Sequence, residues 1–157
     1  MTTRAYVAIG ANLGDARAAV TQAFLDLDAL PHTRVAARSS LYRSAPFEAS
    51  GPDFINAVAA IDTALDAPAL LEALQQLEQR AGRQRPYRNA PRTLDLDLLL
   101  HGDTVLDTPT LTLPHPRMGE RAFVLQPLAE IAPERVAAAA LAAAAGQQIE
   151  RLATRSA

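Results

Sequence analysis

The sequence of 157 residues predicts an α+β fold of the ferredoxin-like type, an antiparallel sheet with helices on one face and a ligand site on the other. Two observations predict it. The elements expected along the chain follow the order strand, helix, strand, strand, helix, strand. Two of the expected strands combine one wholly apolar face with one mixed face, which indicates a sheet packed on one side. No repeat or linker divides the chain, so we expect residues 1–157 to form a single domain.

The first third of the chain supplies a strand, a helix and a second strand. An apolar run predicts a strand over residues 6–9, and Asp15 follows as an N-cap. Apolar residues at helical spacing predict a helix over 16–30. A weaker alternation predicts a strand over 35–42, and residues 44–53 have the composition of a turn.

The middle third supplies the clearest strand, a second helix and a third apolar strand. In the strand over 54–62, one face is wholly apolar and is formed by Ile55, Ala57, Ala59 and Ile61, and the other carries Phe54, Asn56 and Val58. A helix is expected from Pro68 to Ala81, with Gly82 as its C-cap. A strand is expected over 93–101, in which Leu94, Leu96, Leu98 and Leu100 form one face.

The last third is less regular. Gly102-Asp103 is typical of a turn into a short strand at 105–106, which predicts a hairpin with the preceding strand. Residues 111–116 are expected to be irregular. A helix kinked near Pro127 is expected over 121–131, and an alanine-rich helix over 136–145.

The composition excludes several kinds of chemistry. The chain has no cysteine and its 15 basic residues are all arginine, which excludes disulfides, thiolate sites and reactions of a lysine amine. No apolar stretch is long enough for a signal peptide or a membrane span, so we expect a cytoplasmic protein without a membrane partner. The net charge of −2 argues against a nucleic-acid partner. We expect a monomer.

Two aspartates carry the sharpest chemical signal. Asp95 and Asp97 are two residues apart on an expected strand, so both carboxylates leave the sheet on the same side. Two such groups repel each other unless a cation lies beside them. Because Mg²⁺ takes a few carboxylate ligands and completes its shell with phosphates and water, this pair predicts a magnesium site. An acidic, exposed strand face is the alternative interpretation.

The segment before these aspartates favours the magnesium site. It carries five arginines between residues 80 and 92 and no acidic residue. Guanidinium groups pair with phosphate oxygens through two parallel hydrogen bonds. Acids that hold magnesium beside arginines that neutralise oxygens are what a polyphosphate needs, although no P-loop motif is present. His115, held between two prolines, could donate to a phosphate or satisfy a nearby carbonyl. Asn56 could recognise the edge of a planar heterocycle.

The run RNAPRTLDLDLL at 88–99 resembles the signature of the 6-hydroxymethyl-7,8-dihydropterin pyrophosphokinases. Five further blocks, in order along nearly the whole chain, are similar to blocks of that family: AIGANLGD at 8–15, LYRSAP at 41–46, PDFINAV at 52–58, LTLPHPRMGER at 111–121 and FVLQPLAEIAP at 123–133. The chain departs from the family pattern at Ala11, where serine is usual, and at Asn89-Ala90, where Trp-Gly is common. Phe54 stands where some members have tyrosine, which preserves a stacking ring and removes a hydroxyl.

The resemblance implies a reaction as well as a fold. Pyrophosphate would pass from ATP to the hydroxymethyl group of the pterin, giving the pterin diphosphate and AMP, a step of folate biosynthesis. Two Mg²⁺ ions would be held by Asp95 and Asp97, and ATP would be the co-substrate. From this we expect in-line attack by the hydroxymethyl oxygen on the β-phosphorus. Either aspartate could also accept the proton.

The resemblance also assigns residues to the two substrates. Those placed at the pterin are Ser44, Ala45, Pro46, Phe54, Asn56 and Phe123, with the ring stacked between the two phenylalanines. Those placed at ATP are Gln75, Glu78, Arg83, Arg85, Arg92, Leu98, Thr110, Thr112, His115 and Arg121. The expected catalytic residues are Arg83, Arg92, Asp95 and Asp97.

Two other classes of protein stay open at this stage. Sheets of this type also bind RNA by stacking bases on aromatic side chains, but only 4% of the chain is aromatic and its net charge is negative. The chain could instead be a regulator that binds the nucleotide without catalysis. The two aspartates and the loop arginines argue against this second alternative.

Overall fold

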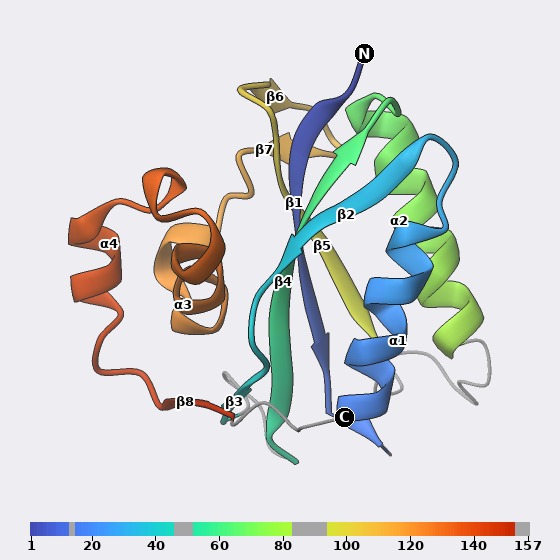
Figure 1. Ribbon diagram of the computed structural model, residues 1–157. Helices are drawn as coiled ribbons and strands as arrows, with labels where there is room; N and C mark the ends of the chain where they lie inside the picture. The colour runs from blue at the N-terminus through green and yellow to red at the C-terminus, as the bar shows by residue number, and fades with distance from the viewer. Residues whose placement is uncertain (13–14, 46–51, 83–93, 153–157) are drawn as a thin grey trace.

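The computed structural model describes residues 1–12, 15–45, 52–82 and 94–152 (Figure 1). The strands and helices in chain order are β1 (Thr3–Ala11), α1 (Ala16–Asp28), β2 (Thr33–Arg38), β3 (Tyr42–Ser44), β4 (Phe54–Thr63), α2 (Ala67–Gly82), β5 (Asp95–His101), β6 (Leu106–Asp107), β7 (Thr112–Leu113), the 3₁₀ turn η1 (Met118–Glu120), α3 (Ala122–Ile131), the 3₁₀ turn η2 (Pro133–Arg135), α4 (Ala138–Ala143) and β8 (Ile149–Arg151). No helix in these parts of the chain is long and apolar enough to cross a membrane.

The main sheet is antiparallel and has the order β5-β1-β4-β3-β8, with β2 also paired to β4. β1 lies between β4 and β5, so the strands on either side of it come from distant parts of the sequence. The expected order of elements and the ferredoxin-like α+β fold are confirmed.

Helices α1 and α2 cover one face of the sheet (Figure 1). The alternation expected in β4 is observed, because Ile55, Ala57, Ala59 and Ile61 all lie in this core with the buried leucines of α2. Asp15 caps α1 as expected, since its Oδ1 accepts a hydrogen bond from the Ala18 amide at 3.0 Å. The sequence therefore encodes this layer through simple periodicity.

The opposite face of the sheet is divided between a helix and a cavity. α3 packs there through Val124 and Leu128, against Tyr6, Val58 and neighbouring apolar residues of the sheet. The helix contains Pro127, as expected. α3 therefore covers part of this face, and a cavity opens on another part of it.

One leucine of β5 lies on a different face from the one expected. Leu94, Leu96 and Leu98 pack in the core under α1 and α2, but Leu100 packs with Leu99 under α3. The pairing of β1 with β5 shifts by one residue at this point, and the extra residue reverses the alternation beyond it. This irregularity thus adds Leu100 to Leu99 on the side of the sheet that α3 covers.

Three further expectations were wrong in detail. The strand expected over 35–42 is split into β2 and β3, because Ser39 turns inward and its hydroxyl accepts a hydrogen bond from the Val58 amide at 2.9 Å. No hairpin joins β5 to the next strand; β6 pairs with β7 instead, around a turn in which the Thr108 hydroxyl bonds Leu111. The alanine-rich helix is confined to 138–143, and β8 follows it.

Gly102 at the end of β5 offers a test of the fold. Its φ of +56° is unfavourable for other residues, and a Cβ there would lie 2.9 Å from Thr3 Cγ2. We expect Gly102→Ala to lower the free energy of unfolding by about 1 to 2 kcal/mol, measured by urea denaturation. The matched control is Gly146→Ala, where a Cβ meets nothing within 4 Å, and it should change stability by less than about 0.5 kcal/mol. Equal effects of both substitutions would contradict this account.

Candidate active site

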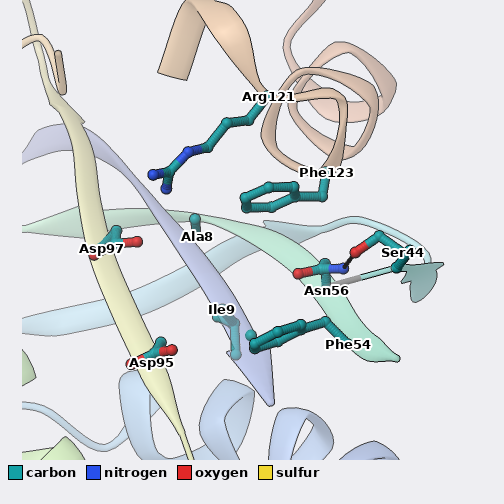
Figure 2. A pocket seen from close by; sticks show the side chains of 11 residues that line it. Ala8, Ile9, Ser44, Phe54, Asn56, Asp95, Asp97, Arg121 and Phe123 are labelled. Atoms are coloured by element: carbon teal, nitrogen blue, oxygen red, sulfur yellow. Dashed lines mark hydrogen bonds between the residues drawn. The ribbon is translucent and has the colours of Figure 1, made fainter. Parts of the chain in front are cut away.

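A cavity of about 180 Å³ opens beside α3, on the part of the same sheet face that this helix does not cover (Figure 2). Its residues come from four strands, from Ala45 just after β3, and from the start of α3: Ala8, Ile9, Gly10, Ser44, Ala45, Phe54, Asn56, Asp95, Asp97, Arg121 and Phe123. The strands therefore form its floor and one wall, and α3 supplies the facing wall.

Small residues of β1 form the floor of the cavity and leave space above it for a ligand. Gly10 pairs with Asn56 on one side and with Asp95 on the other, and Ala8 pairs with Asp97. Paired residues of neighbouring strands project from the same face. The Asn56 amide and the two carboxylates therefore stand on opposite sides of a nearly bare strand. A Cβ at position 10 would lie 3.4 Å from Asn56 Oδ1.

The amide of Asn56 is held in one orientation. Its Nδ2 donates a hydrogen bond to the Ser44 hydroxyl at 2.7 Å, and both residues are buried (Figure 2). The amide oxygen lies on the Gly10 side, where the cavity is. Asn56 can thus present an acceptor and one remaining donor to the edge of a ligand.

Two phenylalanines line the cavity from different layers. Phe54 lies at the start of β4 and Phe123 in the first turn of α3, and in Figure 2 their rings lie on either side of Asn56. The start of α3 is fixed by Gln147, whose Oε1 accepts from the Ala122 amide at 3.0 Å and whose Nε2 donates to the Glu120 carbonyl at 2.7 Å. Aromatic faces in such an arrangement suit a flat ring.

Arg121 brings a positive charge to the carboxylate side of the cavity. Its side chain extends from the start of α3 toward the region of Asp97 (Figure 2), and its guanidinium carbon lies 5.4 Å from the centre of the Phe123 ring. The cavity therefore combines an apolar half with a charged half.

Asp95 and Asp97 are half-buried on one face of β5, as expected. Between them, the Leu96 amide donates to Glu78 Oε2 at 2.8 Å, so a side chain of α2 binds the outer edge of the strand. Among the residues that the structure describes, no group of three or more His, Cys, Asp or Glu side chains could hold a metal. A pair of carboxylate ligands fits Mg²⁺, because this ion takes few protein ligands and completes its shell with water and phosphate oxygens.

A second cavity of about 260 Å³ adjoins the first. It is lined by Leu71, Leu96, Asp97, Leu98, Thr108, Pro109, Thr110, Leu111, Thr112, His115 and Pro116. Asp97 lines both cavities, so the carboxylate stands where the two meet. Within this second cavity, His115 Nδ1 accepts a hydrogen bond from the Arg117 amide at 3.2 Å, which leaves Nε2 as the donor. Burial lowers the pKa of His115 below its usual range, although Asp97 opposes this effect.

The two cavities bring together most of the described residues that the sequence assigned to substrates. Five of those assigned to the pterin line the first cavity: Ser44, Ala45, Phe54, Asn56 and Phe123. Four of those assigned to ATP line the second: Leu98, Thr110, Thr112 and His115. Arg121, also assigned to ATP, lines the first.

Other assigned residues lie elsewhere. Gln75 and Glu78 of α2 are absent from the lining of both cavities, and Gln75 is exposed. Pro46, Arg83, Arg85 and Arg92 lie outside the described residues, as does Arg88. Ala8 and Gly10, which form the floor, were not predicted from the sequence. A glycine ending an apolar strand was the available signal for it.

An α+β fold with two adjoining cavities that share one carboxylate, Asp97, is typical of an enzyme that acts on two substrates. A family model described as 7,8-dihydro-6-hydroxymethylpterin-pyrophosphokinase matches residues 6–133. The chain belongs to this family, and the resemblance drawn from its motifs is confirmed. It is accordingly an enzyme of the pyrophosphokinase class, an ATP-dependent diphosphotransferase.

Individual relatives agree with the family match. The 2-amino-4-hydroxy-6-hydroxymethyldihydropteridine pyrophosphokinase of Pseudomonas aeruginosa is 50% identical over 135 residues, which cover 85% of this chain and 83% of that one. The enzyme of the same name from Methylorubrum extorquens is 45% identical over 135 residues, covering 85% of each chain. Among solved structures, the wild-type HPPK-DHPS of Plasmodium falciparum with pteroate matches with a TM-score of 0.67 at 12% identity. That match covers 85% of this chain and 41% of the longer one, and it supports the fold alone.

The hydrogen bond between Ser44 and Asn56 gives a prediction about the free energy of unfolding of the protein. Ser44→Ala leaves a buried amide hydrogen without its partner, which costs about 1 to 3 kcal/mol. We expect a loss of that size in the free energy of unfolding, measured by urea denaturation. In the Asn56→Ala background the same substitution should cost less, because no amide is then left unpaired. An equal cost in both backgrounds would show that the two side chains are not coupled.

Proposed function

We propose that this chain transfers pyrophosphate from ATP to 6-hydroxymethyl-7,8-dihydropterin, giving the pterin diphosphate and AMP in folate biosynthesis. The observation that carries the proposal is that Asp97 lines both cavities. A heterocycle in the first cavity and a nucleotide in the second would present their reacting groups at the same carboxylate. We further propose that the protein acts as a single-domain monomer in the cytoplasm.

The first cavity would hold the pterin. Its flat ring fits between Phe54 and Phe123, and each such aromatic pair contributes about 0.5 to 1.5 kcal/mol beyond the area it buries. The ring edge alternates donors and acceptors, which the fixed amide of Asn56 and the backbone near Ala45 can match. The hydroxymethyl group would then point over the bare floor of β1 toward Asp97.

The second cavity would hold the nucleotide, with Thr110, Thr112 and His115 as polar contacts. Asp95 and Asp97 would hold Mg²⁺, two ions by analogy with the family, and the metal would neutralise charge on the phosphate oxygens. Arg121, on the side of the first cavity that faces Asp97, is placed to contact the phosphate that is transferred.

The reaction would be an in-line displacement at the β-phosphorus of ATP. The bond from the hydroxymethyl oxygen to this phosphorus forms while the bond to the oxygen bridging to the α-phosphorus breaks, and AMP leaves with that oxygen. The proton of the hydroxyl would pass to Asp95 or Asp97, or to a water molecule beside them. Arg121 would stabilise charge on the transferred group. We assign the same role to Arg83 and Arg92 from the family resemblance alone. With the pterin bound, the two phenylalanines would limit the access of water, which would otherwise compete as the acceptor.

Product analysis tests this proposal directly. The protein is mixed with MgATP and 6-hydroxymethyl-7,8-dihydropterin, and the products are separated by chromatography. We expect AMP and the pterin diphosphate in equal amounts. ADP in place of AMP would mean attack at the γ-phosphorus and would overturn the assigned chemistry. Magnesium-dependent ATP binding without turnover would indicate a non-catalytic binder.

The carboxylate pair gives a quantitative prediction. Asp97→Asn keeps the size of the side chain and removes a charge, so we expect kcat to fall by about 100-fold or more. The magnesium concentration needed for half-maximal rate should rise. Asp26→Asn, on α1 at the other face of the sheet, is the matched control and should leave both quantities unchanged. A wild-type response of Asp97→Asn to magnesium would remove Asp97 from the metal site.

The floor of the first cavity gives a second prediction. Gly10→Ala places a methyl group 3.4 Å from Asn56 Oδ1 and 3.9 Å from Phe54 Cδ1, in the space proposed for the pterin. We expect the KM for the pterin to rise by about 10-fold, with the KM for ATP within about twofold. Gly146→Ala serves as the control. If both KM values rise together, position 10 does not separate the two substrates.

A further inference from the structure

A carboxylate outside the cavity joins the two elements that form its facing walls. Glu130 lies near the end of α3, and its oxygens accept hydrogen bonds from the Ser40 amide at 3.0 and 3.1 Å and from the Ser40 hydroxyl at 2.9 Å. The Tyr42 hydroxyl donates to Glu130 Oε1 at 2.8 Å. α3 is thereby tied to β3 and to the residues just before it.

A third segment joins the same carboxylate. Arg151 of β8 donates from Nη2 to Glu130 Oε2 at 3.2 Å and from Nε to the Ser40 hydroxyl at 3.1 Å. Burial would raise the pKa of Glu130, but the hydrogen bonds from Tyr42 and Ser40 outweigh it, so this pKa lies below its usual range. Burial and the bond to Glu130 raise the pKa of Tyr42 to about 12. At neutral pH the carboxylate is therefore charged and the tyrosine keeps its proton.

β3 and α3, which Glu130 joins through hydrogen bonds, carry opposite walls of the first cavity. Tyr42 and Ser44 are two residues apart on β3, so they share a face of the sheet, and Ser44 orients Asn56. At the other end of α3, Phe123 enters the cavity. A helix transmits a displacement along its axis, and Phe123 and Glu130 are separated by about two turns, or about 10 Å.

Apolar contacts alone would not fix this distance. α3 rests on the sheet through aliphatic side chains such as Val124 and Leu128, and such contacts are non-directional. The Glu130 hydrogen bonds are directional, and their acceptor is an ionised carboxylate, which makes such bonds stronger than bonds between neutral groups. β3 has only three residues, and besides its pairing with β4 and β8 its Tyr42 contacts α3 through Glu130.

We propose that Glu130 is a positioning residue that sets the separation between the Ser44 wall and the Phe123 wall and thereby controls the binding of the pterin. The inference rests on the proposed function, because it takes the first cavity to be the pterin site. Glu130 is not itself part of the cavity lining. It acts through the segments that it joins, and a preorganised site spends less free energy on ordering when the ligand binds.

Two variants test this role. Glu130→Gln keeps the shape of the side chain but removes the charge and one acceptor, and Tyr42→Phe removes only one hydrogen bond. We expect the KM for the pterin to rise by about 10-fold in the first and by about threefold in the second. The KM for ATP should stay within about twofold. Glu134→Gln, a nearby exposed glutamate, is the matched control and should behave as the parent.

A merely structural role would give a different pattern. It would lower the Tm of Glu130→Gln and leave both KM values unchanged at a temperature well below that Tm, and this result would overturn the proposal. If Glu130→Gln does not fold, the same comparison is made with Tyr42→Phe, whose unchanged KM for the pterin would have the same meaning.

Amide hydrogen exchange without substrate separates this inference from the proposed reaction. We expect residues 40–45 to exchange at least about fivefold faster in Glu130→Gln than in the parent or in Glu134→Gln. Unchanged exchange there would overturn the positioning role even if the enzyme is active. If the parent shows no turnover, the proposed function fails, and the pterin affinity measured by calorimetry together with the exchange rates decides the role of Glu130.

Discussion

The alternation of side chains along β1 is the constraint on which the rest of the molecule depends. Val7 and Ile9 point into the core beneath the two long helices, and the residues between and after them, Ala8 and Gly10, point to the other face. Because β1 is paired on both edges, its register also fixes where Asn56 and the two aspartates lie along the neighbouring strands. A one-residue slip would bury the polar groups of the site and expose the core.

The irregularity in the pairing of β1 and β5 lets one strand serve two purposes. Before it, the strand alternates between leucines in the core and carboxylates at the cavity. After it, Leu99 and Leu100 both join the cluster under α3. The helix that carries Phe123 is therefore packed on the same strand that carries Asp97. The relative position of the aromatic wall and the carboxylates follows from a single stretch of backbone, with the contacts of Glu130 and Gln147 fixing the two ends of the helix.

What could be predicted from the sequence is what depends on local periodicity. The faces of β4, the two long helices and the shared orientation of Asp95 and Asp97 follow from repeats of two or 3.6 residues. What depends on a partner far along the chain could not be predicted. The position of Leu100 is set by pairing with β1, and β8 is a short polar segment that becomes a strand only beside β3. At the site, the polar and aromatic side chains could be identified from their residue types. The floor of the cavity could not, because it is formed by a glycine whose role is to have no side chain.

The segment after residue 133, where the family match ends, reaches the site at both ends of one helix. Gln147 binds the start of α3 and Arg151 binds the carboxylate near its end. Variation in this tail can therefore alter the geometry of the cavity without changing a residue that lines it. Two enzymes of this family with identical cavity residues need not share one affinity for their substrate, so comparing pocket residues alone is a poor guide to how an inhibitor will rank among species.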